Sequence, residues 1–208
     1  KLLHRIAGKK LMDTFGGRIR FFGIGGAKLS PDVERFLMEG KFPYAIGYGM
    51  TETSPLIAGA PPKKSRFQST GPKIEGIEVK LINVDPATGI GEIVTKGPHV
   101  MKGYYKNEEL TKAAFTEDGF FKTGDCGSMD KDGYLYIKGR NKNVIVGASG
   151  ENIYPEDIEF VLNKHPLVLE SLVIERDKKL VALVKLDEDS IEKEPASENS
   201  ESSPYAKT

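Results

Sequence analysis

The order of the secondary-structure patterns in the early part of the chain constrains its fold most. Apolar side chains at nearly helical spacing occupy residues 1–15 and predict a first helix. The patterns that follow are a strand over residues 18–22, a tight glycine loop over 23–27, a helix opened by Ser30 and Pro31 that runs to about Gly40, and a strand over 42–46. A strand, a helix and a second strand in this order are typical of a parallel α/β layer.

The sequence changes character from Gly71, where short alternating segments replace the helix patterns. The segments that predict strands cover residues 77–82, 91–96, 120–123 and 134–137, with a short helix from Asn107 to Phe115 between them. Short strands separated by turns predict a small antiparallel sheet or barrel. From residue 140 the predicted elements are a strand over 143–146, a turn over 147–150, a helix opened by Pro155, and strands over 168–174 and 180–186.

We therefore expect a fold of mixed α/β and α+β class, built from three pieces and a tail. The predicted pieces are an α/β subdomain over residues 1–70, a β-rich subdomain over 71–139 and the start of a small α+β domain over 140–186. Residues 187–208 lack an apolar pattern and are dominated by acidic and small polar side chains. Such a composition buries no core, so the tail is predicted to be flexible or to be a helix without packing partners.

Composition and charge exclude several classes of function. The 30 basic and 30 acidic side chains balance, which argues against a nucleic-acid-binding surface. The single cysteine, Cys126, excludes a disulfide framework within the chain and favours a reducing compartment; we expect it to be a packed residue. With no apolar run of membrane-spanning length and no signal peptide in the sequence, a cytoplasmic location is expected. The sequence opens without Met inside an amphipathic pattern, which predicts a piece of a longer protein.

The segment Gly47-Tyr48-Gly49-Met50-Thr51-Glu52 carries the residue types of a nucleotide site. Glycines allow a ligand to approach the backbone, and an aromatic ring offers a flat face to a base. The Thr51 hydroxyl can donate to a phosphate oxygen, and the Glu52 carboxylate is a hard oxygen ligand suited to Mg²⁺. By itself, the segment is equally typical of an ordinary strand-to-helix turn.

Four motifs in sequence order resemble the adenylate-forming superfamily, which includes acyl-CoA synthetases, luciferases and the adenylation domains of peptide synthetases. They are the glycine loop at Gly25, the segment 47–52, Thr123-Gly124-Asp125 and Gly139-Arg140-Asn141-Lys142. Residues 97–105 and 150–159 resemble the long-chain fatty-acid–CoA ligases most closely. Because several motifs keep their order and spacing over about residues 15–186, the resemblance is specific.

The resemblance implies an enzyme that joins a carboxylic acid to coenzyme A. In that family the carboxylate attacks ATP to form an acyl-adenylate and pyrophosphate, the small C-terminal domain rotates, and the coenzyme A thiol displaces AMP. The implied ligands are a fatty acid, ATP or AMP, Mg²⁺ and coenzyme A, and a long acyl chain would favour peripheral contact with a membrane. The family's acyl pocket lies mostly upstream of these motifs, so aryl, short-chain and peptide-synthetase substrates stay open. A nucleotide-binding module without catalysis is the alternative outside the enzymes.

The resemblance also implies a role for each matching residue. Gly25, Gly26 and Ala27 would form the wall between the adenine and the acyl pocket, where a larger side chain would block the ligand. In the nucleotide site, Tyr48, which lies between Gly47 and Gly49, would contact the adenine, and the Thr51 hydroxyl would bond to the α-phosphate. Glu52 would bind Mg²⁺. Asp125 would bind both ribose hydroxyls, and Arg140 would contact the ribose or a phosphate. Lys142 would act in catalysis as the hinge of the domain rotation, and Gly150 would line the tunnel for the pantetheine arm.

Two positions depart from the family's pattern, and two of its motifs are missing. Ile46 stands where glutamine is common, and Asn143 stands where an acid is common after the hinge. The sequence contains neither the phosphate loop that ends in lysine nor the catalytic lysine of the small domain. Because electrostatic stabilisation is usually the largest contribution to catalysis, this chain by itself is predicted to be inactive or nearly so.

Overall fold

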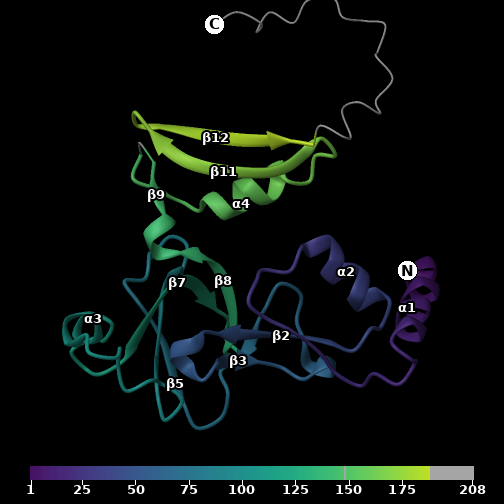
Figure 1. Ribbon diagram of the computed structural model, residues 1–208, viewed down its shortest axis with the longest axis horizontal. Helices are drawn as coiled ribbons and strands as arrows, with labels where there is room; N and C mark the ends of the chain where they lie inside the picture. Colours follow the sequence, from purple (N-terminus) through teal and green to yellow (C-terminus); the bar gives the residue numbers. More distant parts are fainter. Residues whose placement is uncertain (148, 188–208) are drawn as a thin grey trace, which may run out of the picture. The chain divides into compact units, whose positions relative to one another are not determined.

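The computed structural model describes residues 1–147 and 149–187, which fall into two compact units (Figure 1). The first unit spans Lys1–Val144, and the second begins at Ile145. None of the helices in the described part of the chain is long and apolar enough to cross a membrane.

The second unit begins five residues after residue 140, the predicted start of the small domain. The finer division into residues 1–70, 71–139 and 140–186 stays a prediction. The predicted tail, residues 187–208, lies outside the described residues except for Asp187.

An α/β layer opens the first unit, with the predicted order of strand, helix and strand. Its elements are α1 (Leu2–Thr14), β1 (Phe22–Ile24), α2 (Pro31–Glu39), β2 (Tyr44–Gly49) and β3 (Leu56–Gly59). β1 and β2 are parallel, as predicted, and β3 pairs antiparallel with β2. α1 and α2 pack so closely that a Cβ on Gly8 would lie 2.4 Å from the carbonyl oxygen of Gly40.

Both predicted strands of this layer have different bounds in the structure. The strand predicted over residues 18–22 begins only at Phe22, because the Phe22 amide donates to the carbonyl oxygen of Pro43 at 2.8 Å and starts the pairing with β2. β1 then continues into the predicted glycine loop as far as Ile24. The strand predicted over residues 42–46 runs on to Gly49, because β3 folds back onto it and supplies hydrogen-bonding partners.

A five-stranded antiparallel sheet forms the rest of the first unit and confirms the predicted small antiparallel sheet. Its strands are β4 (Gly71–Pro72), β5 (Glu78–Ile82), β6 (Gly91–Lys96), β7 (Phe121–Met129) and β8 (Tyr134–Arg140), in the order β4-β8-β7-β6-β5. β7 and β8 are longer than predicted because they pair with each other from Asp125 and Arg140 to Met129 and Leu135. The short helix α3 (Glu108–Ala113) begins after Asn107, whose Oδ1 accepts a hydrogen bond from the Leu110 amide at 3.0 Å.

Side chains from both sheets share one buried cluster in the first unit. β2 and β3 contribute Tyr48, Ile57 and Ala58, and the second sheet contributes Ile93 and Leu135. Ile57, Ile93 and Leu135 have no exposed surface. Burial of this much apolar surface is the main favourable contribution to folding, and here it holds the end of β2 against the middle of the second sheet.

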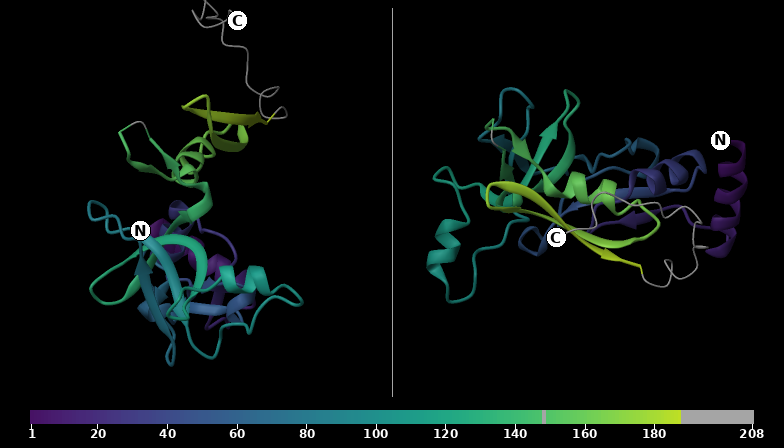
Figure 2. Two further views of the ribbon diagram at one scale, coloured as in Figure 1. Left: turned by 90° about the vertical axis from the view of Figure 1, so that its left-hand side faces the viewer. Right: turned by 90° about the horizontal axis from the view of Figure 1, so that it is seen from above.

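The described residues of the second unit form one helix and two antiparallel pairs of strands. Its elements are β9 (Ile145–Val146), β10 (Asn152–Ile153), α4 (Pro155–Leu162), β11 (Val168–Arg176) and β12 (Lys179–Leu186). α4 packs against one face of the β11–β12 hairpin, where Ser171 and Val173 are buried (Figure 2). The strand predicted over residues 143–146 is shorter in the structure because Asn143 ends a single-turn 3₁₀ helix, Asn141–Asn143.

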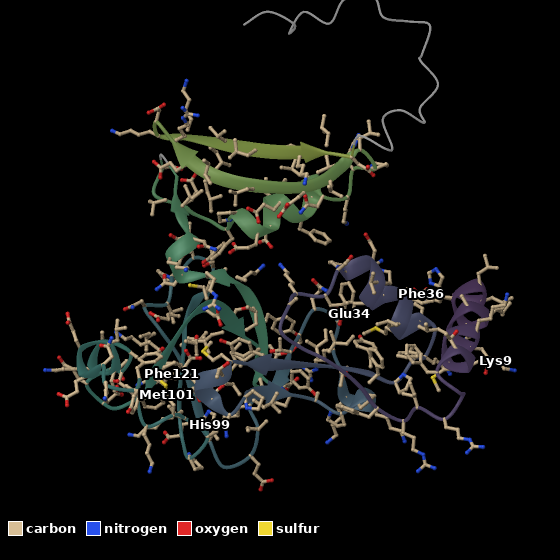
Figure 3. All side chains as sticks on the ribbon, in the orientation of Figure 1. Lys9, Glu34, Phe36, His99, Met101 and Phe121 are labelled. Carbon is tan, nitrogen blue, oxygen red and sulfur yellow. The ribbon has the colours of Figure 1, made fainter. Side chains whose placement is uncertain are left out.

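Glu34 is a fully buried carboxylate in the first unit (Figure 3). Its Oε1 accepts a hydrogen bond from the Tyr44 hydroxyl at 3.1 Å. Its Oε2 accepts from the Gln68 backbone amide at 2.9 Å and from the Gln68 side-chain amide at 2.5 Å. Burial, together with the charge of Glu34, raises the pKa of Tyr44 well above its usual value, so the hydroxyl stays a donor. Glu34 therefore ties α2 both to β2 and to the loop before β4.

We expect Glu34→Ala to lower the free energy of unfolding by about 3 kcal/mol or more, because it leaves buried donors without an acceptor. Urea unfolding followed by circular dichroism measures this change. Glu75→Ala, at an exposed loop position with no side-chain partner among the described residues, is the control and should change stability by less than about 0.5 kcal/mol. Equal stabilities of the two variants would contradict a structural role for the Glu34 network.

Candidate functional site

A cavity of about 530 Å³ opens where β1 and β2 end. Four glycines predicted for the nucleotide site line it, Gly25 and Gly26 after β1 and Gly47 and Gly49 in β2, together with Tyr48. Ala27 is not among the lining residues. In open α/β sheets, ligands bind at the carboxyl ends of the strands, where the connections diverge. The cavity therefore lies where ligands bind in such sheets, and its glycines let a ligand approach the backbone closely.

Tyr48, Asp125 and Arg140 meet beside this cavity, although they come from three different strands. The Tyr48 hydroxyl donates to Oδ2 of Asp125 at 2.7 Å. The Nε of Arg140 lies 3.1 Å from Oδ1 of the same carboxylate, since the two residues are opposite each other in the β7–β8 pair. The structure thus brings together three residues that were predicted to contact adenine and ribose.

Burial distinguishes the three members of this cluster. Asp125 is 7% exposed, whereas the Arg140 side chain is half-exposed. Burial and the charge of Asp125 raise the pKa of Tyr48 far above its usual value, so Tyr48 remains a neutral donor. Each carboxylate oxygen of Asp125 can accept more than one hydrogen bond, which is the property needed to bind a pair of vicinal hydroxyls. The adenine contact predicted for the Tyr48 ring stays a prediction.

Thr51 and Glu52 lie in a single-turn 3₁₀ helix, Thr51–Thr53, that connects β2 to β3. Thr53 anchors this turn: it is fully buried, and the single proton of its hydroxyl lies within reach of the carbonyl oxygens of Met50, at 3.0 Å, and Pro55, at 2.8 Å. Thr51 is exposed and Glu52 is half-buried, so both side chains are available at the end of β2. Their predicted contacts with phosphate and metal stay predictions.

The surroundings of Glu52 fit a magnesium ion that arrives with a nucleotide. In residues 1–147 and 149–187 there is no group of three His, Cys, Asp or Glu side chains that could hold a metal by themselves. Oε1 of Glu52 accepts a hydrogen bond from the Tyr104 hydroxyl at 3.1 Å, and Oε2 accepts none from the described residues. Mg²⁺ is commonly held by one or two carboxylates together with phosphate oxygens and water. The donor set present here is therefore sufficient only for a metal shared with phosphate.

The roles predicted for Lys142 and Gly150 stay predictions. Lys142 is exposed in the 3₁₀ helix that follows β8 and ends the first unit. Gly150 belongs to the second unit, with a φ of 86° and open space where a Cβ would be. A backbone with φ in this region favours glycine.

Residues that the motif analysis did not assign to the site also support it. The Thr123 hydroxyl accepts a hydrogen bond from the Asp125 amide at 3.1 Å. The Tyr104 hydroxyl donates to the Glu52 carboxylate. Burial is the larger cause, and this hydrogen bond the second, of a raised pKa of Tyr104. Tyr104 lies within residues 97–105, which carry the resemblance to fatty-acid ligases, but its spacing from Glu52 contains no signal of the contact.

Two other reactive side chains of the first unit take structural positions. Cys126 is buried in β7, which confirms the prediction of a packed residue. His99, in the loop after β6, places Nε2 at 3.0 Å from the Thr95 hydroxyl, and burial lowers its pKa (Figure 3).

Comparison with known proteins identifies a matching family and several relatives. A family profile described as AMP-binding enzyme matches residues 2–105, half of the chain. The long-chain-fatty-acid–CoA ligase FadD15 of Mycobacterium bovis is 34% identical over 189 residues, which cover 90% of this chain and 30% of that protein. The 2-succinylbenzoate–CoA ligase of Bacillus licheniformis is 39% identical over 176 residues, covering 82% and 36%.

Solved structures show the same likeness. The o-succinylbenzoate CoA synthetase of Bacillus subtilis, in complex with its acyl-adenylate intermediate, superposes with a TM-score of 0.74 at 33% identity, covering 91% of this chain and 41% of that one. The same enzyme in complex with ATP and magnesium ion gives a TM-score of 0.70 at 32% identity, and the match covers 86% of this chain and 40% of that one.

The sequence and structural matches thus place the chain in the adenylate-forming superfamily. The chain belongs to the family of AMP-binding enzymes. It spans about 30% of the length of the long-chain-fatty-acid–CoA ligase named above.

Proposed function

We propose that this chain supplies part of the nucleotide site of an ATP-dependent acyl-CoA synthetase. The observation that carries the proposal is the Tyr48–Asp125–Arg140 cluster beside the glycine-lined cavity. A buried carboxylate held by a neutral hydroxyl and a guanidinium is rigid, and Tyr48, which supplies that hydroxyl, lines a cavity large enough for a ligand. The membership of the chain in the AMP-binding family supports a nucleoside as that ligand.

The proposed chemistry is the reaction that the family resemblance implies, with the residues of this chain in the roles predicted for them. In the first half-reaction, an oxygen of the carboxylic acid attacks the α-phosphorus of ATP, and the bond to pyrophosphate breaks. Asp125 holds the ribose hydroxyls, and the Thr51 hydroxyl donates to the α-phosphate, so the phosphorus keeps one orientation toward the acid. When bound through Glu52, Mg²⁺ would neutralise phosphate charge. In the second half-reaction, the thiol sulfur of coenzyme A attacks the acyl carbon, the bond from that carbon to the phosphate oxygen of AMP breaks, and the thiol proton is released to water.

We propose a long-chain fatty acid as the acyl substrate. Support comes from residues 97–105 and 150–159, which resemble those of fatty-acid ligases, and from the similarity to a long-chain-fatty-acid–CoA ligase. An aromatic acid is the second candidate, because a 2-succinylbenzoate–CoA ligase is 39% identical over 176 residues.

ATP–pyrophosphate exchange across a panel of carboxylic acids tests this proposal. We expect the complete gene product to exchange best with long-chain fatty acids, and this 208-residue chain, assayed beside it, to be silent. Fastest exchange with 2-succinylbenzoate or another aromatic acid would select the second candidate. Absence of exchange with every acid would contradict the catalytic proposal and favour a nucleotide-binding module without catalysis.

A further inference from the structure

The loop that precedes α3 contacts Glu52 at two points. The Met101 amide donates to the backbone carbonyl oxygen of Glu52 at 2.8 Å. Three residues later in the same loop, the Tyr104 hydroxyl donates to Oε1 of the Glu52 side chain at 3.1 Å. One contact fixes the backbone of Glu52, and the other fixes the direction of its carboxylate.

Both partners of the Tyr104–Glu52 bond are held in place independently of each other. On the Glu52 side, the buried Thr53 hydroxyl accepts a hydrogen bond from the Met50 amide at 3.1 Å and closes the 3₁₀ turn. On the other side, the Tyr104 amide donates to the Thr111 hydroxyl at 2.9 Å, and that hydroxyl donates to the carbonyl oxygen of Asn107 at 2.7 Å. The Tyr104 backbone is therefore tied to α3 before its side chain reaches Glu52.

Close packing at Gly103 narrows the position of Tyr104 further. A Cβ at Gly103 would lie 2.7 Å from Cγ2 and 2.9 Å from the hydroxyl oxygen of Thr111. Gly103 also has a φ of 153°, a backbone angle that residues other than glycine rarely adopt. The loop thus packs directly against α3, and this contact restricts the position of the Tyr104 backbone, from which the side chain starts.

We propose that Tyr104 is a positioning residue for the metal that accompanies the nucleotide. By holding Oε1 of Glu52, it directs Oε2, which accepts no hydrogen bond from the described residues, toward that metal. Groups that orient a metal-binding carboxylate through a hydrogen bond commonly change metal affinity when they are removed. The inference rests on the proposed function, because that function assigns the metal to Glu52.

A purely structural role explains the contact less well. Tyr104 is 39% exposed, and the hydrogen bond lies at the surface of the first unit. Hydrogen bonds that water can replace contribute little to the free energy of unfolding. The main effect of the Tyr104–Glu52 hydrogen bond is therefore to orient the half-exposed carboxylate of Glu52.

Tyr104→Phe tests this role, with Tyr105→Phe as the matched control. Tyr105 is the next residue in the sequence and is 88% exposed, and its substitution by Phe removes one hydroxyl oxygen, as at position 104. Isothermal titration calorimetry gives the ATP dissociation constant of the chain with Mg²⁺ and with EDTA. We expect Tyr104→Phe to weaken the Mg²⁺-dependent gain in ATP affinity about tenfold. The ATP affinity in EDTA should be unchanged, and Tyr105→Phe should behave as the unsubstituted chain.

Glu52→Gln extends the test to the pair of residues. If Tyr104 acts through Glu52, Tyr104→Phe added to Glu52→Gln should cause no further loss of the Mg²⁺-dependent gain. A Mg²⁺-dependent gain that Tyr104→Phe leaves intact would overturn this inference alone, and so would equal losses with Mg²⁺ and with EDTA. Failure of the unsubstituted chain to bind ATP under both conditions would overturn the proposed function, and this inference with it.

Discussion

Replacement of Gly49 by alanine is expected to lower the free energy of unfolding of the first unit by about 4 kcal/mol or more. A Cβ at this position would lie 1.7 Å from the carbonyl oxygen of Pro55, 2.7 Å from its carbonyl carbon and 3.0 Å from the Cα of Leu56. All three atoms belong to the backbone that folds back from β2 into β3, so no side-chain rotation relieves the overlap. The strands must separate, and the turn that carries Thr51 and Glu52 moves with them.

Gly47→Ala is the matched control for this prediction, two residues earlier on the same strand. Its Cβ would meet the Cδ1 atom of the Leu56 side chain at 3.0 Å, and that side chain can rotate away. We expect a loss of about 1 kcal/mol or less. Chemical unfolding of both variants, followed by circular dichroism, measures the difference. Equal losses at positions 47 and 49 would show that the β2–β3 turn yields easily and would contradict the prediction.

Asp125→Asn is expected to weaken ATP binding by the chain about 100-fold or more, because it removes a charged acceptor from the bonds to the ribose. Asparagine keeps the shape of the side chain but presents an amide nitrogen to a donor. Either the Tyr48 hydroxyl or the Arg140 guanidinium then faces another donor. Isothermal titration calorimetry measures the dissociation constant, and urea unfolding checks that the variant is folded.

The nucleotide itself offers a sharper test of the role of Asp125. The unsubstituted chain should bind 2′-deoxy-ATP and 3′-deoxy-ATP more weakly than ATP, whereas Asp125→Asn should distinguish them from ATP much less. Asp13→Asn, at an exposed position of α1, makes the same chemical change away from the site and should leave all three affinities unchanged. A variant at Asp125 that still discriminated the deoxy nucleotides as the unsubstituted chain does would show that the ribose binds elsewhere.

The elements of the fold could be predicted where their causes are local. Pro31 sets the start of α2, Asn107 caps α3, and the alternation over residues 91–96 matches β6 residue for residue. Strand ends were predicted poorly where a partner strand decides them. β2 runs on to Gly49 because β3 pairs with it, and β7 and β8 lengthen because they pair with each other.

The candidate site was predictable as a set of residues but not as an arrangement. Gly47, Tyr48, Asp125 and Arg140 were found through their motifs. The structure places Gly47 and Tyr48 in the lining of one cavity, and it joins Tyr48 and Arg140 to the Asp125 carboxylate. The contact between Tyr104 and Glu52 was missed, because the two residues are 52 positions apart and neither belongs to a pattern that contains the other.

The sequence by itself determined the class of fold, the family and the residue types available for chemistry, because these depend on local spacing and on motifs in order. Only the tertiary structure decided why Gly49 must be glycine and which side chains hold Glu52 and Asp125. The Tyr48–Asp125 bond joins residues 77 positions apart, and it forms because the core shared by Ile57, Ile93 and Leu135 presses the two sheets of the first unit together. A contact of that range is a property of packing between sheets, which neighbouring residues in the sequence do not encode.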